Sequence, residues 1–317
     1  MSETPLSIGI DFGGTSVKFG VLYRSNIIDQ SPAISTPDFD GPQALIEAML
    51  RVIEDLRERH PAIAAIGVGV PGFVHFEKGI VHNLTNVPGW TSIPLKKHLA
   101  DATKLPVVVE NDANCMAYAE WKRGAGRGLD HLIALTLGTG VGGGVIANGQ
   151  MVRGAQFGAG EVGQMSIDWQ GRRGAYGNLG ALEDYIGNNE IAADTRDTYL
   201  KAGIERHLAE CTPAALAKAA MAGDEIALGI WDRIAAKLAT GIMNCCWLLN
   251  PQAIIIGGGV AKAGDILFTP LTAHLYAQLS APFKEHLMIL PARFGNEAGM
   301  VGAAALALEE AGVVIQP

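Results

Sequence analysis

Two segments of this sequence share one plan, in which a short apolar strand runs into glycines and the chain then continues as a second strand. The first copy covers 8–22 and the second covers 133–146. Aligning the copies pairs four positions: Ile8 with Ile133, Asp11 with Thr136, Gly13 with Gly138 and Val21 with Ile146. One such turn is an ordinary hairpin. Its repetition predicts a protein built from two similar halves, each with a β-hairpin near its start.

The glycine turns have a composition suited to phosphate binding. Adjacent glycines let the backbone approach a bulky anion, and their N–H groups, with the Thr15 hydroxyl, can point at phosphate oxygens. Asp11 precedes the first turn, where a carboxylate can hold a hydrated Mg²⁺ in front of those oxygens. A third turn, 257–259, follows the apolar run 254–256. The turns match neither the Walker pattern nor the dinucleotide-binding fingerprint, so they predict a nucleotide site assembled from the two halves.

The composition indicates a folded, acidic protein. The 317 residues suffice for two domains, and 49% hydrophobic with 18% charged residues excludes extensive disorder. A net charge of −8 argues against nucleic-acid binding. Apolar runs stay shorter than the roughly 18 residues of a membrane span, and the N-terminus lacks a signal-peptide pattern. We therefore expect a cytoplasmic protein with buried free thiols at its four cysteines: Cys115, Cys211, Cys245 and Cys246.

Apolar patterning predicts alternating strands and helices. Residues at helical spacing through 45–56 indicate a helix for which Asp40 is the expected N-cap. Further elements are expected as helices over 225–249 and 298–311 and as strands over 65–70 and 107–109. Such alternation indicates an α/β protein, a mixed sheet with helices on its faces.

Polar side chains at the ends of buried strands are the candidate ligand-binding groups, because ligands of open α/β sheets bind there. Asn111 and Asp112 follow the strand 107–109. Asn111 can donate to and accept from a sugar hydroxyl, and Asp112 can take the proton of an attacking hydroxyl. The alternative is that Asp112 caps the following helix and Asn111 is a turn residue. Glu161 and Glu183 can accept paired hydrogen bonds from adjacent sugar hydroxyls, although Glu183 is also suited to a helix N-terminus.

Seven motifs, in order along nearly the whole chain, resemble the ROK family of sugar kinases and more narrowly its glucokinase branch. They lie at 11–15, 71–72, 86–90, 110–114, 137–144, 160–163 and 256–259. The resemblance implies the actin-like ATPase fold, a duplicated ribonuclease H-like α/β fold with two domains and a cleft between them. On this basis 1–117 and 300–317 are expected to form a small N-terminal domain, and 118–299 a larger C-terminal domain.

The resemblance also implies an activity and roles for individual residues. The activity is transfer of the γ-phosphoryl group of ATP, with Mg²⁺, to a sugar hydroxyl, with glucose as the expected substrate and Asp112 as the general base. Sugar-binding roles are implied for Gly72, Asn86, Asn111, Asp112, Glu161, Gln164 and Glu183. ATP-binding roles fall on Asp11, Gly13, Gly14, Thr15, Lys18, Gly138, Thr139, Gly140, Gly258 and Gly259. Asp11 is in addition expected to hold the Mg²⁺ through water.

The chain departs from its relatives at a zinc site. ROK kinases usually bind a structural zinc through one histidine and three cysteines, and here Gln164 stands in the place of the histidine. The thiol positions hold Gly174, Tyr176 and Ala181. Tetrahedral zinc cannot be held by these side chains, so we expect no structural zinc. The loop 171–183 is instead expected to be held by packing of Tyr176 and Leu179 and by backbone hydrogen bonds, and Gln164 is expected to keep a hydrogen bond to the sugar.

Several alternatives stay open at this point. The sugar could be N-acetylmannosamine, N-acetylglucosamine, mannose or fructose, and the phosphoryl donor could be polyphosphate. A ROK-type repressor is disfavoured because the first hairpin starts at residue 8 and leaves no room before it for a DNA-binding segment. A sugar-binding protein without catalysis is disfavoured by the presence of Asp11 and Asp112. The expected partners are small-molecule sugar and ATP, with no nucleic acid or membrane, and family members commonly form a homodimer or homotetramer.

Overall fold

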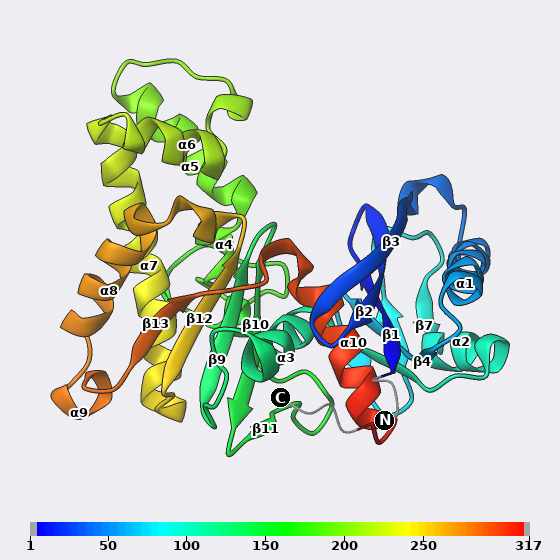
Figure 1. Cartoon of the computed structure of the whole chain (residues 1–317). Helices are drawn as coiled ribbons and strands as arrows, with labels where there is room; N and C mark the ends of the chain where they lie inside the picture. Colours follow the sequence, from blue (N-terminus) through cyan, green and yellow to red (C-terminus); the bar gives the residue numbers. More distant parts are fainter. Residues whose placement is uncertain (1–4, 314–317) are drawn as a thin grey trace. The chain divides into compact units, whose positions relative to one another are not determined.

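The structure is a computed structural model that describes residues 5–313, and it divides into two compact units. Unit 1 contains the chain up to Arg127, the segment Met151–Ala159 and the chain from Phe294, whereas unit 2 contains Gly128–Gln150 and Gly160–Arg293. In Figure 1 the colours show how the elements of each unit follow one another along the chain.

The domain limits predicted from the sequence lie inside two continuous helices. The limit 117/118 falls within α3 (Asp112–Arg123), and 299/300 falls within α10 (Ala298–Glu310). Hydrogen bonds between successive turns tie a helix together, and the compact units change over outside both helices. The division into a small domain of 1–117 with 300–317 and a larger domain of 118–299 stays a prediction.

Unit 1 is built on a five-stranded mixed sheet. In sheet order its strands are β3 (Asn26–Ser35), β2 (Ser16–Tyr23), β1 (Leu6–Phe12), β4 (Ile63–Val70) and β8 (Val107–Asn111). The first three strands pair antiparallel, and β4 and β8 run parallel to β1. A small antiparallel sheet follows, made of β5 (Val74–His75), β6 (Ile80–Asn83) and β7 (Thr91–Ile93).

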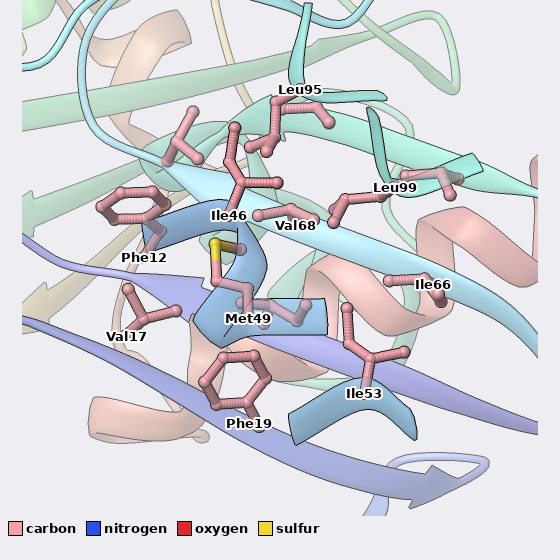
Figure 2. Packing of buried hydrophobic residues seen from close by; sticks show 14 of the residues in the cluster. Phe12, Val17, Phe19, Ile46, Met49, Ile53, Ile66, Val68, Leu95 and Leu99 are labelled. Atoms are coloured by element: carbon pink, nitrogen blue, oxygen red, sulfur yellow. The ribbon is translucent and has the colours of Figure 1, made fainter. Parts of the chain in front are cut away.

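Helices α1 (Pro42–Arg59) and α2 (Leu95–Thr103) cover one face of the unit 1 sheet. Figure 2 shows Met49 and Ile53 of α1 among the same buried apolar side chains as Phe19 of β2. The predicted helix is confirmed, but the expected cap at Asp40 is wrong. Gly41 occupies the N-cap without a side-chain bond. Pro42 stands at the first helical position, where its missing N–H is one of the groups that find no partner within a helix.

The opposite face of this sheet is covered by α10 and α3. A Cβ atom added to Gly67 would overlap the carbonyl of Ala303, and one added to Gly9 would overlap that of Met300. Only glycine allows the C-terminal helix to approach the strands this closely. The expectation that the last helix packs back onto the N-terminal part of the chain is thereby confirmed.

Unit 2 repeats the strand order of unit 1. Its sheet contains β11 (Gln150–Met151), β10 (Val141–Ala147), β9 (Leu132–Leu137), β12 (Ala253–Gly258) and β13 (Met288–Pro291). As in unit 1, a hairpin is followed by two strands parallel to its first strand. The predicted duplication is therefore confirmed at the level of topology.

One alignment from the sequence is wrong by a residue. Ile8 pairs with Val21 across the first hairpin, whereas Ile133 pairs with Val145 across the second. Val21 therefore corresponds to Val145, and not to Ile146. The reason is the closing pair of each hairpin: residues 13–16 lie between the paired Phe12 and Val17, whereas only 138–140 lie between the paired Leu137 and Val141.

The helices of unit 2 are α4 (Glu183–Ile186), α5 (Asn188–Lys201), α6 (Pro213–Met221), α7 (Glu225–Leu249), α8 (Asp265–Ala277) and α9 (Ala281–Lys284). The predicted helix α7 is confirmed, and it is followed by its C-cap Asn250, which has the left-handed conformation and precedes Pro251. All four cysteines are buried and free, as expected. Within residues 5–313, none of the helices is long and apolar enough to cross a membrane.

Candidate active site

The candidate residues of unit 1 gather at one edge of its sheet. Strand pairing aligns Asp11 of β1 with Gly69 of β4, and Gly69 with Glu110 of β8. Gly72 follows the end of β4, and Asn111 ends β8. Parallel strands end at the same edge, which is where open α/β sheets bind ligands. The structure thus brings these predicted residues together.

Asn111 is the N-cap of α3. Its Oδ1 accepts hydrogen bonds from the backbone N–H groups of Ala113 (2.9 Å) and Asn114 (3.1 Å), and its Nδ2 donates to the Gly72 carbonyl (3.1 Å). Because its backbone is extended (φ −63°, ψ 143°), Asn111 holds the cap, and Asp112 is the first helical residue. The alternative with Asp112 as the cap is therefore wrong. A ligand would meet Asn111 through the second hydrogen of its amide nitrogen.

The glycine turn of unit 1 is closed by internal hydrogen bonds. Gly13 N–H donates to the Ser16 carbonyl (2.9 Å), so the donors a phosphate would meet belong to the later turn residues Gly14 and Thr15. Thr36, which the sequence analysis missed, is fully buried and donates from its hydroxyl to the Gly14 carbonyl at 2.9 Å. Asn86 also lies against this turn, because a Cβ atom added to Gly14 would be 2.7 Å from its Nδ2.

Asp11 is a carboxylate in a partly buried position. Burial raises its pKa above the ordinary value, and the ammonium of Lys18, 3.5 Å away, opposes that rise. A Cβ atom added to Gly299, in the first turn of α10, would be 3.2 Å from the Asp11 Oδ1. The carboxyl group thus lies between a lysine and the start of a helix, two features that favour anions.

The glycines of unit 2 divide into two kinds. Gly258 has φ +89°, and a Cβ atom there would overlap the backbone of Leu137 on the neighbouring strand, so the fold itself requires glycine. A Cβ atom on Gly138 or Gly259 would find no atom within 4 Å. Neither of these two glycines is needed for packing within the described chain, and side chains there would occupy the space in front of the turns.

Glu161, Gln164 and Glu183 form a cluster in unit 2. The Gln164 Nε2 donates to the Glu183 Oε1 at 2.7 Å, and the Val141 N–H donates to the other oxygen at 3.3 Å. Burial raises the pKa of Glu161, and the negative charge of Glu183 raises it further. A Cβ atom on Gly140 would be 2.6 Å from the Glu183 Oε2. Glu183 therefore connects the predicted sugar residues to the glycine turn.

Tyr176 and Leu179 do not hold the loop 171–183, contrary to expectation. Their side chains are 72% and 40% exposed. The expected backbone hydrogen bonds are confirmed: Ile167 to Gly180 (2.8 Å), Gly180 to Arg172 (2.7 Å) and Gly174 to Asn178 (2.8 Å). The Asn178 Nδ2 also donates to the Gln164 carbonyl at 2.9 Å. A Cβ atom on Gly174 would lie 2.8 Å from Asn178 Oδ1 and 2.7 Å from Asp184 Oδ2. The side chains of Asn178 and Asp184, and not that of Tyr176, therefore occupy the space beside this former thiol position.

This geometry predicts unequal effects of two loop substitutions. Tyr176→Ala should leave the melting temperature and the KM for sugar nearly unchanged, because the ring is mostly in water. Asn178→Ala should raise the sugar KM several-fold, because the Gln164 backbone loses a hydrogen bond worth about 1 kcal/mol. Steady-state kinetics on both variants tests this. A larger effect from Tyr176→Ala than from Asn178→Ala would contradict the role given to Asn178.

The duplicated sheets with a glycine turn in each define the class, a two-unit α/β protein of the actin-like ATPase fold, as predicted. The chain belongs to the ROK family, whose model matches residues 7–310. It is 34% identical over 307 residues to a glucokinase of Halalkalibacterium halodurans, covering 93% of this chain and 92% of that protein.

Two further relatives agree with this assignment. A glucokinase of Thermotoga maritima is 34% identical over 311 residues, which cover 96% of this chain and 98% of that protein. The solved structure of a ROK family glucokinase from Streptomyces griseus, in complex with glucose and AMPPNP, superposes with a TM-score of 0.81 at 29% identity, covering 96% of this chain and 99% of that one. The resemblance seen in the sequence motifs is confirmed.

Proposed function

We propose that this protein is an ATP-dependent hexose kinase that converts glucose to glucose 6-phosphate. The observation that carries the proposal is the junction of β8 and α3 at the carboxyl edge of the sheet, where Asn111 caps the helix, donates to the Gly72 carbonyl and is followed by Asp112 as the first helical residue. The names of the Halalkalibacterium halodurans and Thermotoga maritima relatives support glucose as the acceptor.

The proposed reaction needs positioning and one base. The sugar hydroxyl oxygen forms a bond to the γ-phosphorus of ATP, the bond from that phosphorus to the bridging oxygen of ADP breaks, and the hydroxyl proton moves to the Asp112 carboxylate. In this scheme Glu161 and Glu183 accept hydrogen bonds from sugar hydroxyls, and Gln164 holds Glu183 in place through its 2.7 Å bond. A direct hydrogen bond from Gln164 to the sugar stays a prediction.

The donor set fits Mg²⁺ as a companion of ATP. Across residues 5–313 there is no group of three or more His, Cys, Asp or Glu side chains able to hold a metal ion. Mg²⁺ bound with ATP keeps several waters and needs only one or two carboxylates in addition to phosphate oxygens. We propose Asp11, which lies at the end of β1 beside the turn of unit 1, as that carboxylate. When bound, Mg²⁺ would neutralise charge on the phosphates.

We also propose that no structural zinc is bound, since Gln164, Gly174, Tyr176 and Ala181 offer neither imidazole nor thiol. Metal analysis of the purified protein tests this, and one zinc per chain would contradict it. A cytoplasmic location and assembly into a homodimer or homotetramer stay predictions.

A coupled assay of ADP release over a panel of sugars tests the proposed activity. With ATP and Mg²⁺, glucose should give the highest kcat/KM, ahead of mannose, fructose, N-acetylmannosamine and N-acetylglucosamine. A parallel reaction with polyphosphate, read as glucose 6-phosphate, tests the alternative donor. Absence of turnover with every sugar would contradict the proposed kinase activity. A higher kcat/KM for another sugar would contradict only glucose as the preferred substrate.

The raised pKa of Glu161 predicts a pH-dependent stability. A raised pKa means that the folded protein binds this proton more tightly than the unfolded chain, so stability falls as pH rises through the range of the carboxyl group. Glu161→Gln should therefore raise Tm slightly at pH 7, and the difference should shrink as the pH falls through the range of the carboxyl group. Melting curves from pH 4 to 8 measure this, with the exposed Glu54→Gln on α1 as control. A Glu161→Gln variant less stable than the parent at pH 7 would contradict the argument.

A further inference from the structure

A buried ion pair lies directly behind the Asn111–Asp112 junction. The Arg153 Nε donates to the Glu110 Oε2 at 2.7 Å, and the Glu110 side chain is only 2% exposed. A carboxylate taken out of water needs a charged partner and further hydrogen bonds to stay ionised. The proposed reaction and the residue roles implied by the sequence motifs assign no function to Glu110 or Arg153.

The other oxygen of Glu110 bonds to the residues on both sides of Asp112. Its Oε1 accepts the backbone N–H of Asn111 at 2.8 Å and the Nδ2 of Asn114 at 3.1 Å. Asn114 is 2% exposed and its own N–H binds the cap oxygen of Asn111. One carboxylate thereby binds Asn111, which precedes Asp112, and Asn114, which follows it in the first turn of α3. These two contacts fix the backbone that carries Asp112.

Arg153 reaches Glu110 from a separate part of the chain. It belongs to Met151–Ala159, a segment counted with unit 1 although the residues on either side of it belong to unit 2. The Arg153 guanidinium lies 3.7 Å from the centre of the Phe76 ring, and the Arg153 carbonyl accepts the Ala159 N–H at 3.0 Å. The side chain is thus held in one orientation by a ring stacked on it and by a closed backbone loop.

We propose that Glu110 and Arg153 are positioning residues for phosphoryl transfer, which rests on the proposed role of Asp112. Glu110 sets the orientation of Asn111 and Asp112, and Arg153 holds the Glu110 carboxylate in place through the 2.7 Å contact. A pair that served stability alone could be exchanged for apolar side chains without loss. The direction of the Glu110 bonds, toward the neighbours of Asp112, is what ties this pair to the reaction.

The test is the kinetics of Arg153→Met, Glu110→Gln and the double variant. Each single variant should lower kcat by about 10–100-fold, because a misplacement of about 1 Å in a reacting group costs that much, while the KM for ATP changes less than about 2-fold. Arg153→Lys should restore part of kcat because it keeps the charge. The double variant should lose less than the product of the single losses, since it leaves no unpaired charge. The matched control is Arg196→Met, which removes an exposed arginine paired with Asp197.

The outcomes separate this inference from the proposed function. Turnover by the protein without substitutions tests the proposed kinase activity. Amide hydrogen exchange over 110–114 tests the positioning role of Glu110 and Arg153, and it does so whether or not a sugar is turned over. Faster exchange there in Arg153→Met, with the rest of unit 1 unchanged, supports the positioning role. Unchanged exchange over 110–114, or a loss of kcat no larger than the loss of folded protein in melting curves, would overturn it.

Discussion

Replacing Asp112 with asparagine is expected to lower kcat by about 10²–10⁴, the usual contribution of a general base. The variant should fold normally, because the amide oxygen can still accept the Ala113 N–H that the Asp112 Oδ1 accepts at 2.8 Å. The helix also keeps its cap, which is Asn111. The change therefore removes the proton acceptor and little else, so the sugar KM should stay within a few-fold of the parent value.

The control for this substitution is Asp101→Asn on α2. Asp101 is exposed and paired with Lys97 on the surface, so the same chemical change there should leave kcat unchanged. Both variants should melt within about 2 °C of the parent protein. An Asp112→Asn enzyme with near-normal turnover would remove Asp112 from the mechanism and with it the basis of the proposed reaction scheme.

Much of the fold could be predicted because its signals are local. The strand before Gly13 and the strand before Gly138 are apolar runs that end at glycines, and such runs specify buried strands without long-range information. The error at Asp40 lies at a point where the backbone conformation of one residue decides. Asp40 has a cap-forming side chain, but the extended residue before α1 is Gly41, and in the same way Asn111 and not Asp112 precedes α3. Composition alone does not show which neighbour takes that conformation.

The supporting contacts of the site could not be predicted, because they join distant parts of the chain. Thr36 binds the Gly14 carbonyl, and Arg153 binds Glu110, from positions that no local pattern connects. The expectation that Tyr176 and Leu179 hold the loop 171–183 is wrong for a related reason. The sequence shows that Tyr176 is large, but tertiary packing decides where its side chain points, and in the structure it is exposed while the Asn178 side chain lies beside Gly174.

Gly138→Val is expected to weaken ATP binding by about 10–100-fold while sugar binding stays nearly unchanged. Hydrogen bonds to a charged group contribute about 1.5–3 kcal/mol each, and losing one through displacement of the phosphates gives a change of this size. The fold should tolerate the substitution, because a Cβ atom at Gly138 meets no atom within 4 Å and the backbone there does not require glycine. The variant thus tests whether Gly138 is needed for ligand binding and not for the fold.

Two comparisons make this experiment decisive. Gly258→Val should lose stability outright, since Gly258 has φ +89° and lies against the backbone of Leu137. Gly229→Val in α7 should leave ATP affinity unchanged, because a Cβ atom there has its nearest neighbour, the Arg233 Nη1, at 3.8 Å. Calorimetric titration with ATP and separately with glucose measures each affinity. Normal ATP affinity in a folded Gly138→Val protein would show that the second glycine turn does not approach the phosphates, and the two-turn nucleotide site would have to be abandoned.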